Sequence, residues 1–144
     1  MTREEILALE GNDLNKAVAI EVMGFEEISE HADLKRKQIS SYLPGCGIIA
    51  LYGDYYIARF LGKSVTWNPH ENISVAFEVI KKMREKGYDY AIESLNDSLN
   101  AGGDLTHVRF FKRLEGDYHE YDSEVSVMHG ISICALLAVL GEEE

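Results

Sequence analysis

Residues 127–140 decide the fold, and they read Val-Met-His-Gly-Ile-Ser-Ile-Cys-Ala-Leu-Leu-Ala-Val-Leu. Ser123 or Ser126 can cap this segment and Gly141 follows it, so we predict a helix that runs to Leu140. Apolar side chains lie nearly all round this helix, and a helix without a polar face must be covered on more than one side. A sheet can cover one side. The N-terminal helices or a second subunit must cover the other.

Two further helices are predicted near the N-terminus. Thr2 and Glu5 have the spacing of a capping box, in which each side chain accepts a hydrogen bond from a backbone N–H of the first turn. Asp13 is the predicted cap of a second helix over residues 14–23. The polar stretch 26–43 that follows has few apolar residues, and we predict a solvated loop with one helical turn.

The rest of the chain predicts strands and one central helix. Gly53-Asp54 suits the two-residue connection of a tight hairpin. Asn68 is the predicted N-cap of the central helix, with Pro69 as its first residue and Glu71 as its capping-box partner, and Gly87 ends it. The predicted strands cover residues 48–52, 55–61, 88–93, 105–112 and 118–121, with a short extended piece over 65–67.

The element order is therefore αα-ββ-α-ββ-α in a single domain, residues 1–144. Hairpins dominate the predicted strand pairing, so the sheet is expected to be mainly antiparallel, with helices on its faces. The predicted fold class is α+β, a mainly antiparallel sheet sandwiched by helices.

Charge and composition exclude several classes of function. The chain has 25 Asp and Glu against 14 Lys and Arg, for a formal net charge of −11. This charge argues against non-specific binding of nucleic acid and against adhesion to an anionic membrane. The longest apolar run, 131–140, is shorter than the ~20 residues that span a bilayer. Cys46 and Cys134 form no CxxC pair, as expected for reduced thiols. We expect a cytoplasmic protein that binds neither nucleic acid nor membrane.

Motifs for catalysis are incomplete. The tripeptide Gly62-Lys63-Ser64 matches the end of a P-loop, but that motif needs a glycine where Ile57 stands. No histidine pair has metal-ligand spacing, so we expect no metal and no cofactor. If their strands pair in register, His107 and His119 would meet on one face as a metal or acid–base site; otherwise both face water. Cys134 is predicted to be a core residue, because a nucleophilic thiol needs an accessible, electropositive setting.

Aromatic residues crowd around the predicted hairpin. Core packing or a dimer contact is the plain interpretation of such a cluster. The alternative is a stacking pocket between the hairpin and the start of the central helix, where a helix N-terminus would favour an anionic ligand. The residues predicted to line this pocket are Tyr55, Tyr56, Trp67, Asn68, His70 and Asn72.

Three patches of sequence carry a family resemblance. They are 67–80 (Trp-Asn-Pro-His-Glu-Asn-Ile-Ser-Val-Ala-Phe-Glu-Val-Ile), the N-terminal 2–9 with 17–19 and 22–25, and the ending 131–139. Their order and spacing resemble the phage ABA sandwich domain family. The resemblance implies a sheet between helical layers and a phage or prophage origin, and it brings no catalytic residues. The turn His70-Glu71-Asn72 and a longer hairpin depart from the family's pattern.

We therefore expect a small, non-catalytic accessory protein encoded by a phage or prophage. A homodimer is expected through the last helix or through the aromatic edge of the hairpin, because a chain of this length leaves little room to bury every apolar face. The expected partner, besides a second subunit, is a host protein or a small-molecule ligand. The alternative is a module that binds or sequesters a nucleotide-like small molecule.

Overall fold

The structure is a computed structural model of the chain, and it describes residues 1–28, 47–97 and 103–140. Helices, one π-helical segment and strands alternate along these residues. In chain order they are α1 (Arg3–Leu7), α2 (Gly11–Ala17), the π-helix η1 (Val18–Val22), β1 (Glu26–Ile28), β2 (Gly47–Tyr52), β3 (Tyr55–Phe60), β4 (Lys63–Thr66), α4 (Ile73–Glu85), β5 (Asp89–Asp97), β6 (Gly103–Lys112), β7 (Asp117–Ser123) and α5 (Val127–Leu140).

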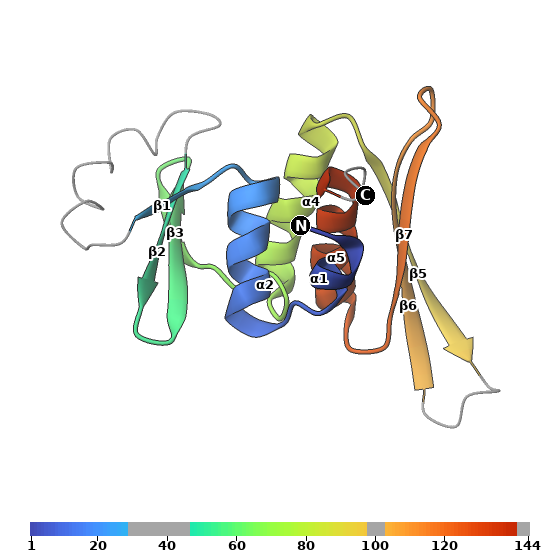
Figure 1. Cartoon of the computed structure of the whole chain (residues 1–144), viewed down its shortest axis with the longest axis horizontal. Helices are drawn as coiled ribbons and strands as arrows, with labels where there is room; N and C mark the ends of the chain where they lie inside the picture. The colour runs from blue at the N-terminus through green and yellow to red at the C-terminus, as the bar shows by residue number, and fades with distance from the viewer. Residues whose placement is uncertain (29–46, 98–102, 141–144) are drawn as a thin grey trace.

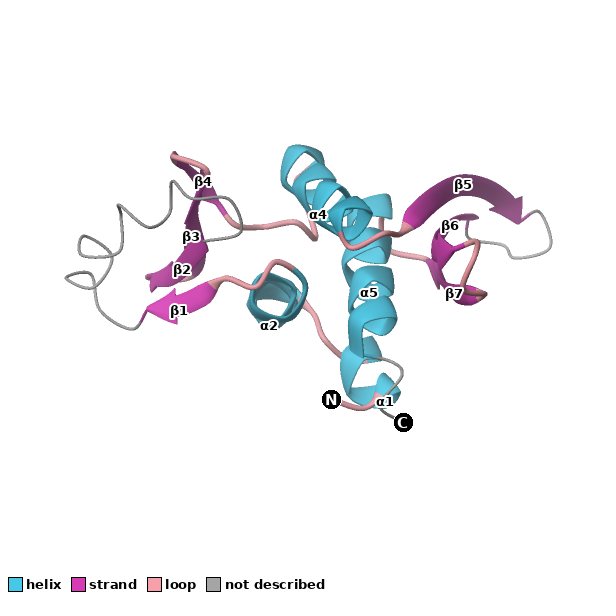
Figure 2. Ribbon diagram, turned by 90° about the horizontal axis from the view of Figure 1, so that it is seen from above, coloured by secondary structure: helices cyan, strands magenta, loops and turns pink. Residues whose placement is uncertain are grey.

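The strands form two sheets, and the helices lie between them (Figures 1 and 2). Sheet A has the order β1-β2-β3-β4, and sheet B has the order β5-β6-β7. Every neighbouring pair is antiparallel except β1 with β2, which is parallel. The α+β class with mainly antiparallel pairing is confirmed. In place of the expected single sheet between helices, the structure has a helical layer between two sheets.

The last helix accounts for this layering. Residues 131–138 of α5 are all 2% exposed or less. One side of α5 contacts β6 and β7, and its other sides contact α4, η1 and α1. A helix that is apolar on every side becomes the central layer of the domain. Residues 131–138 are covered by helices and strands of the same chain, so this part of α5 has no exposed face that a second subunit could contact.

The N-terminal helices differ from prediction at the second one. The capping box is confirmed, because Thr2 Oγ1 accepts from the Glu5 N–H at 3.2 Å and Glu5 Oε1 accepts from the Thr2 N–H at 3.5 Å. The prediction that Asp13 caps the second helix is wrong. Glu10 is the N-cap residue and Asp13 lies within the first turn, where its negative charge is favourable to the helix dipole. The helix continues as the π-helix η1.

The start of the central helix was also predicted wrongly. Asn72, four residues after Asn68, is its N-cap, and Asn72 Oδ1 accepts from the backbone N–H groups of Ser74 at 3.0 Å and Val75 at 3.4 Å. Residues 68–72 form a separate turn, closed by the Asn72 N–H donating to the Asn68 carbonyl at 3.0 Å. Both asparagines are good caps locally, so residue preference alone does not choose between them.

The polar stretch after the second helix contains a strand. Residues 26–28 form β1, which pairs with β2 through Glu26↔Ile48 and Ile28↔Ala50, so the loop prediction is wrong here. Its remainder, 29–43, lies outside the described residues, as does Cys46.

Of the two serines predicted as the cap of the last helix, Ser126 caps α5, since its Oγ accepts from the His129 N–H at 3.0 Å. No helix in the described part of the chain is long and apolar enough to cross a bilayer.

Candidate functional site

Trp67, at the centre of the predicted ligand site, belongs to the core. Its side chain is 0% exposed. The ring lies edge-on to Phe25 and Phe60, with centroids 5.1 Å and 6.0 Å away. The indole Nε1–H donates to the backbone carbonyl of Asn15 at 2.9 Å. Both the ring and the N–H are therefore engaged by the chain itself.

The two predicted tyrosines lie on opposite faces of sheet A. Successive side chains of a strand point to opposite faces. Tyr56 is buried and belongs to the main core, whereas Tyr55 is exposed at the end of the hairpin. The structure therefore brings only one of the pair near the helical layer.

The polar residues of the predicted site meet in the loop between β4 and α4. His70 Nδ1 lies 2.8 Å from Oδ1 of Asn15, a buried residue of α2. Asn68 Nδ2 donates to Glu71 at 3.5 Å, and Asn72 caps α4. Burial, and after it the charge of His70, lower the pKa of His129 at the start of α5. These contacts fasten the loop to the helical layer.

His107 and His119 lie on opposite faces of sheet B, which corrects the predicted site. In the β6–β7 register His107 faces Asp122, and His119 faces Phe110. Phe110 is buried against the helices, so His119 lies on that inner face, while His107 shares the outer face with Asp122. The four-residue turn 113–116 fixes which residues of β6 and β7 pair, and so determines the face on which each histidine lies. The two rings cannot act on one substrate.

On the inner face, His119 belongs to a hydrogen-bonded cluster. Its Nε2 lies 2.6 Å from Asp117 Oδ1, and the Tyr88 hydroxyl donates to Asp117 Oδ2 at 3.0 Å. Burial opposes ionisation of Asp117, but the hydrogen bonds from Tyr88 and His119 outweigh it and lower the pKa. Nearby, burial raises the pKa of the Cys134 thiol to about 12, as expected for a core cysteine.

The P-loop-like tripeptide has no phosphate-binding geometry. Gly62, with φ of +74°, forms the turn between β3 and β4, and Lys63 begins β4. The Lys63 ammonium pairs with Glu78 at 2.7 Å and lies 4.8 Å from the Phe60 ring centroid. A P-loop leads into a helix, and a strand follows here.

The outer face of sheet B is the side of β5, β6 and β7 that points away from the helices (Figure 2). No described helix or strand covers it. His107 lies between two carboxylates, with Asp122 at its Nδ1 and Glu120 Oε2 3.3 Å from its Nε2. Arg109 pairs with Glu93 at 2.5 Å, and the Tyr118 hydroxyl donates to Glu120 at 3.0 Å.

The sequence contains a signal for this face, in the alternation of polar residues along β7. The alternation over Tyr118, Glu120 and Asp122 has the period of two that places all three on one side of a strand. Among the residues that the structure describes, no group of three or more His, Cys, Asp or Glu side chains is placed to hold a metal ion.

Comparisons with known proteins identify no relative. No protein-family model matches the chain. A search of curated proteins and a search of solved structures likewise find no match.

Proposed function

We propose that this protein is a non-catalytic binding module that recognises the basic surface of a partner protein through the outer face of sheet B. The observation that carries the proposal is the row Asp122–His107–Glu120, held on a sheet face that no described element covers. A sheet face that no described element covers presents a surface on which a partner can dock.

The charge of this face favours a basic partner. Asp89, Glu93, Glu120 and Asp122 face outward, and each is about half exposed. Arg109 and His107 lie between them. The chain as a whole carries −11, so its field attracts a positively charged surface over a longer range than these contacts alone.

The face also has the composition of an interface. Tyr118 is exposed beside Arg109, and tyrosine and arginine are enriched where proteins bind one another. The Arg109–Glu93 ion pair and the hydrogen bond from Tyr118 to Glu120 hold both side chains in defined positions, which lowers the entropy cost of ordering them on binding.

Two features support a binding role rather than catalysis. The Cys134 thiol is buried with a raised pKa, so it is not a nucleophile. The histidine pair that could have formed an acid–base site is divided between two faces.

Site-directed photo-crosslinking tests the proposal. A photo-crosslinking residue replaces Tyr118, and in a matched protein it replaces Tyr55, an exposed tyrosine of sheet A. We expect a partner captured from position 118 and not from position 55. Its affinity, measured with purified proteins, should fall about tenfold or more in Glu120→Lys and Asp122→Lys, but not in Glu21→Lys on η1. Capture from both positions, no capture at 118, or unchanged affinity in the reversed variants would contradict the proposal.

Self-association through the hairpin is a second candidate. Leu51 and Tyr55 are exposed large side chains near the tip of the β2–β3 hairpin, and they lie on opposite faces of sheet A because Leu51 pairs with Tyr56. A homodimer that packs around this tip would cover both side chains, and light scattering coupled to size-exclusion chromatography would detect it. A monomeric mass at high protein concentration, or a dimer unaffected by Leu51→Lys, would remove this candidate.

The resemblance to phage ABA sandwich proteins adds a phage or prophage origin, and action in the host cytoplasm, to the proposal. This part rests on the three sequence patches alone. Because phage genes of related role are clustered, the genome neighbourhood tests it. Neighbours without any phage gene would count against it.

A further inference from the structure

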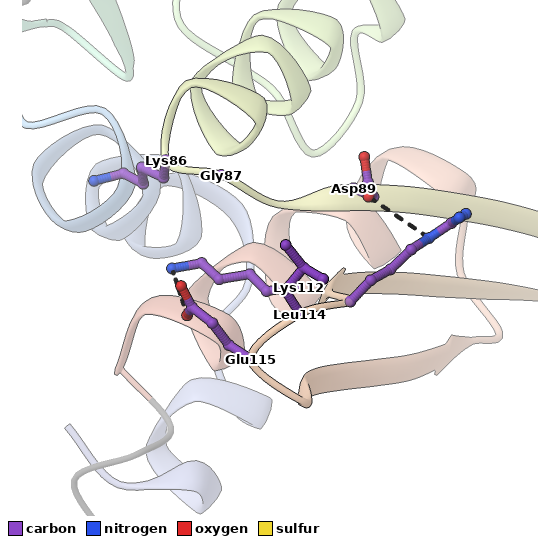
Figure 3. Close-up of a pocket in the computed structure, with 7 residues that line it drawn as sticks. Lys86, Gly87, Asp89, Lys112, Leu114 and Glu115 are labelled. Atoms are coloured by element: carbon purple, nitrogen blue, oxygen red, sulfur yellow. Dashed lines mark ion pairs between the residues drawn. The ribbon is translucent and has the colours of Figure 1, made fainter.

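The helix-facing side of sheet B is covered unevenly. α5 packs against β6 and β7, and Phe110 of β6 is fully buried on this side. Tyr90 of β5 pairs with Phe110, so Tyr90 and Ile92 point to the same side. Asp89 points the other way, toward the outer face, and pairs with Arg113 (Figure 3). Tyr90 and Ile92 are each still 36% exposed, so the described helices leave this side of β5 open.

One edge of α4 continues the open area. The buried stripe of α4 faces α5 and η1. Ile73 and Phe77, four residues apart, border this stripe along one edge, and Glu78 borders it along the other. The 2.7 Å ion pair of Glu78 with Lys63 turns its edge toward β4. Because α4 lies between β4 and β5 (Figure 2), the edge with Ile73 and Phe77 faces sheet B, and these side chains are 44% and 47% exposed.

The α4–β5 surface comprises Ile73, Phe77, Tyr90 and Ile92. Single exposed apolar side chains are ordinary on a protein, but a group of them on one side of the molecule marks an interaction site. The two residues of each pair lie about 6–7 Å apart along their element, close to the advance of one helical turn. A helix packed here would extend the helical layer over β5, as α5 does over β6 and β7. The surface therefore suits the apolar stripe of an amphipathic helix.

The charged residues on the same edge of α4 are cations. Arg84 lies seven residues after Phe77, two turns further along this edge, and it is exposed without an ion-pair partner in the described part of the chain. The Lys81 side chain is 63% exposed, and its ammonium is 3.8 Å from Glu78, beyond direct hydrogen-bond distance. Glu78 and Glu85 lie nearer the β4 side. In an acidic chain, this edge is a local reversal of charge.

We propose that the α4–β5 surface binds an amphipathic helix of a partner protein, with acidic residues of that helix opposite Lys81 and Arg84. Charge complementarity favours such a partner. A second copy of this chain fits poorly, because a twofold interface would set the two cations of one copy against those of the other. This surface is separate from the outer face of sheet B, which prefers a basic partner.

Fluorescence anisotropy of the full chain with two labelled peptides tests the proposal. Both peptides are held helical by a hydrocarbon staple and carry leucine at positions i, i+3, i+4 and i+7. One peptide has glutamate beside the leucines, and the other has lysine at the same positions. We expect saturable binding of the glutamate peptide. Because the chain carries −11, non-specific attraction would favour the lysine peptide instead. No saturable binding of the glutamate peptide would overturn the proposal.

Variants locate the binding. Phe77→Ser and Tyr90→Ser should each weaken binding of the glutamate peptide about tenfold or more, as expected on removing an interface anchor. Leu51→Ser, at the exposed hairpin tip of sheet A, is the matched control and should leave the affinity unchanged. Arg84→Glu should weaken binding of the glutamate peptide and strengthen binding of the lysine peptide. Lys16→Glu makes the same reversal of sign on α2 and should have neither effect.

Three results with these variants would contradict the assignment. Equal losses in Phe77→Ser and Leu51→Ser would show unspecific adhesion to apolar side chains. A lysine peptide that loses as much affinity in Phe77→Ser as the glutamate peptide does would exclude a preference for an acidic partner. A dimer of the chain, detected by light scattering and abolished by Phe77→Ser, would show that a second copy occupies the surface. Phe77 is about half exposed, so its variant tests the surface even if Tyr90→Ser lowers stability.

Discussion

The indole Nε1–H of Trp67 donates a 2.9 Å hydrogen bond to the backbone carbonyl of Asn15, 52 residues earlier in the chain. The side-chain Oδ1 of the same asparagine lies 2.8 Å from His70 Nδ1. Asn15 is 1% exposed, so α2 is joined to the loop before α4 by buried polar contacts on both its backbone and its side chain. Buried polar groups of this kind are costly to leave unpaired.

Replacing Trp67 by Phe should therefore destabilise the protein. The smaller ring leaves a cavity, and the Asn15 carbonyl loses its donor; the unsatisfied buried acceptor alone costs about 1–3 kcal/mol. Chemical denaturation followed by circular dichroism measures the free energy of unfolding. Tyr55→Phe, at an exposed site, is the control and should change it by less than ~0.5 kcal/mol. Equal stability of Trp67→Phe and wild type would show that the hydrogen bond contributes nothing net.

Stability should fall on the acid side of neutrality because of His129. Burial, and after it the charge of His70, lower the pKa of His129 in the folded state, with Glu10 opposing them. The unfolded chain then takes up the proton first, at about pH 6.5, so the free energy of unfolding decreases as the pH falls below that value. Chemical denaturation at several pH values between 5 and 8 should show that the free energy of unfolding decreases less steeply with falling pH in His129→Gln than in wild type. The same slope in both proteins would contradict this assignment.

The Cys134 thiol should be inert in the folded protein. Its pKa is raised to about 12 by burial, and its Sγ lies 3.5 Å from the backbone carbonyls of Val108 and His119. In a Cys46→Ser variant, where it is the single thiol, reaction with a thiol reagent should occur only through unfolding. The labelling rate should rise with denaturant in parallel with unfolding. Rapid labelling in native buffer would refute the buried placement.

Gly47→Ala should be destabilising despite its small size. A Cβ at Gly47 would collide with the ring of Phe25, which packs between Phe60 and Trp67. Overpacking of this kind costs about 1–3 kcal/mol. The effect should be smaller in a Phe25→Leu background, because the narrower side chain leaves room. An equal cost in both backgrounds, measured as a double-mutant cycle, would show that the Phe25 contact is not responsible.

Some parts of the candidate sites were readable from the sequence and others were not. The core position of Cys134 followed from its place in an apolar helix. The face on which His107 and His119 lie depends on the number of residues in the turn between β6 and β7. The turn has four residues, and one more or one fewer would place both rings on the same face.

The sequence by itself determined what local interactions decide: the Thr2–Glu5 capping box, the hairpin at Gly53-Asp54, the burial of 131–138, and the α+β class. Each depends on neighbours within one turn or one strand, or on hydrophobic periodicity, and these are legible in a linear chain. Tertiary structure alone decided that the strands divide into two sheets around the helices, and that Asn72 rather than Asn68 caps α4. Those outcomes depend on contacts between distant residues, such as Asn15 with Trp67 and His70, which no local pattern contains.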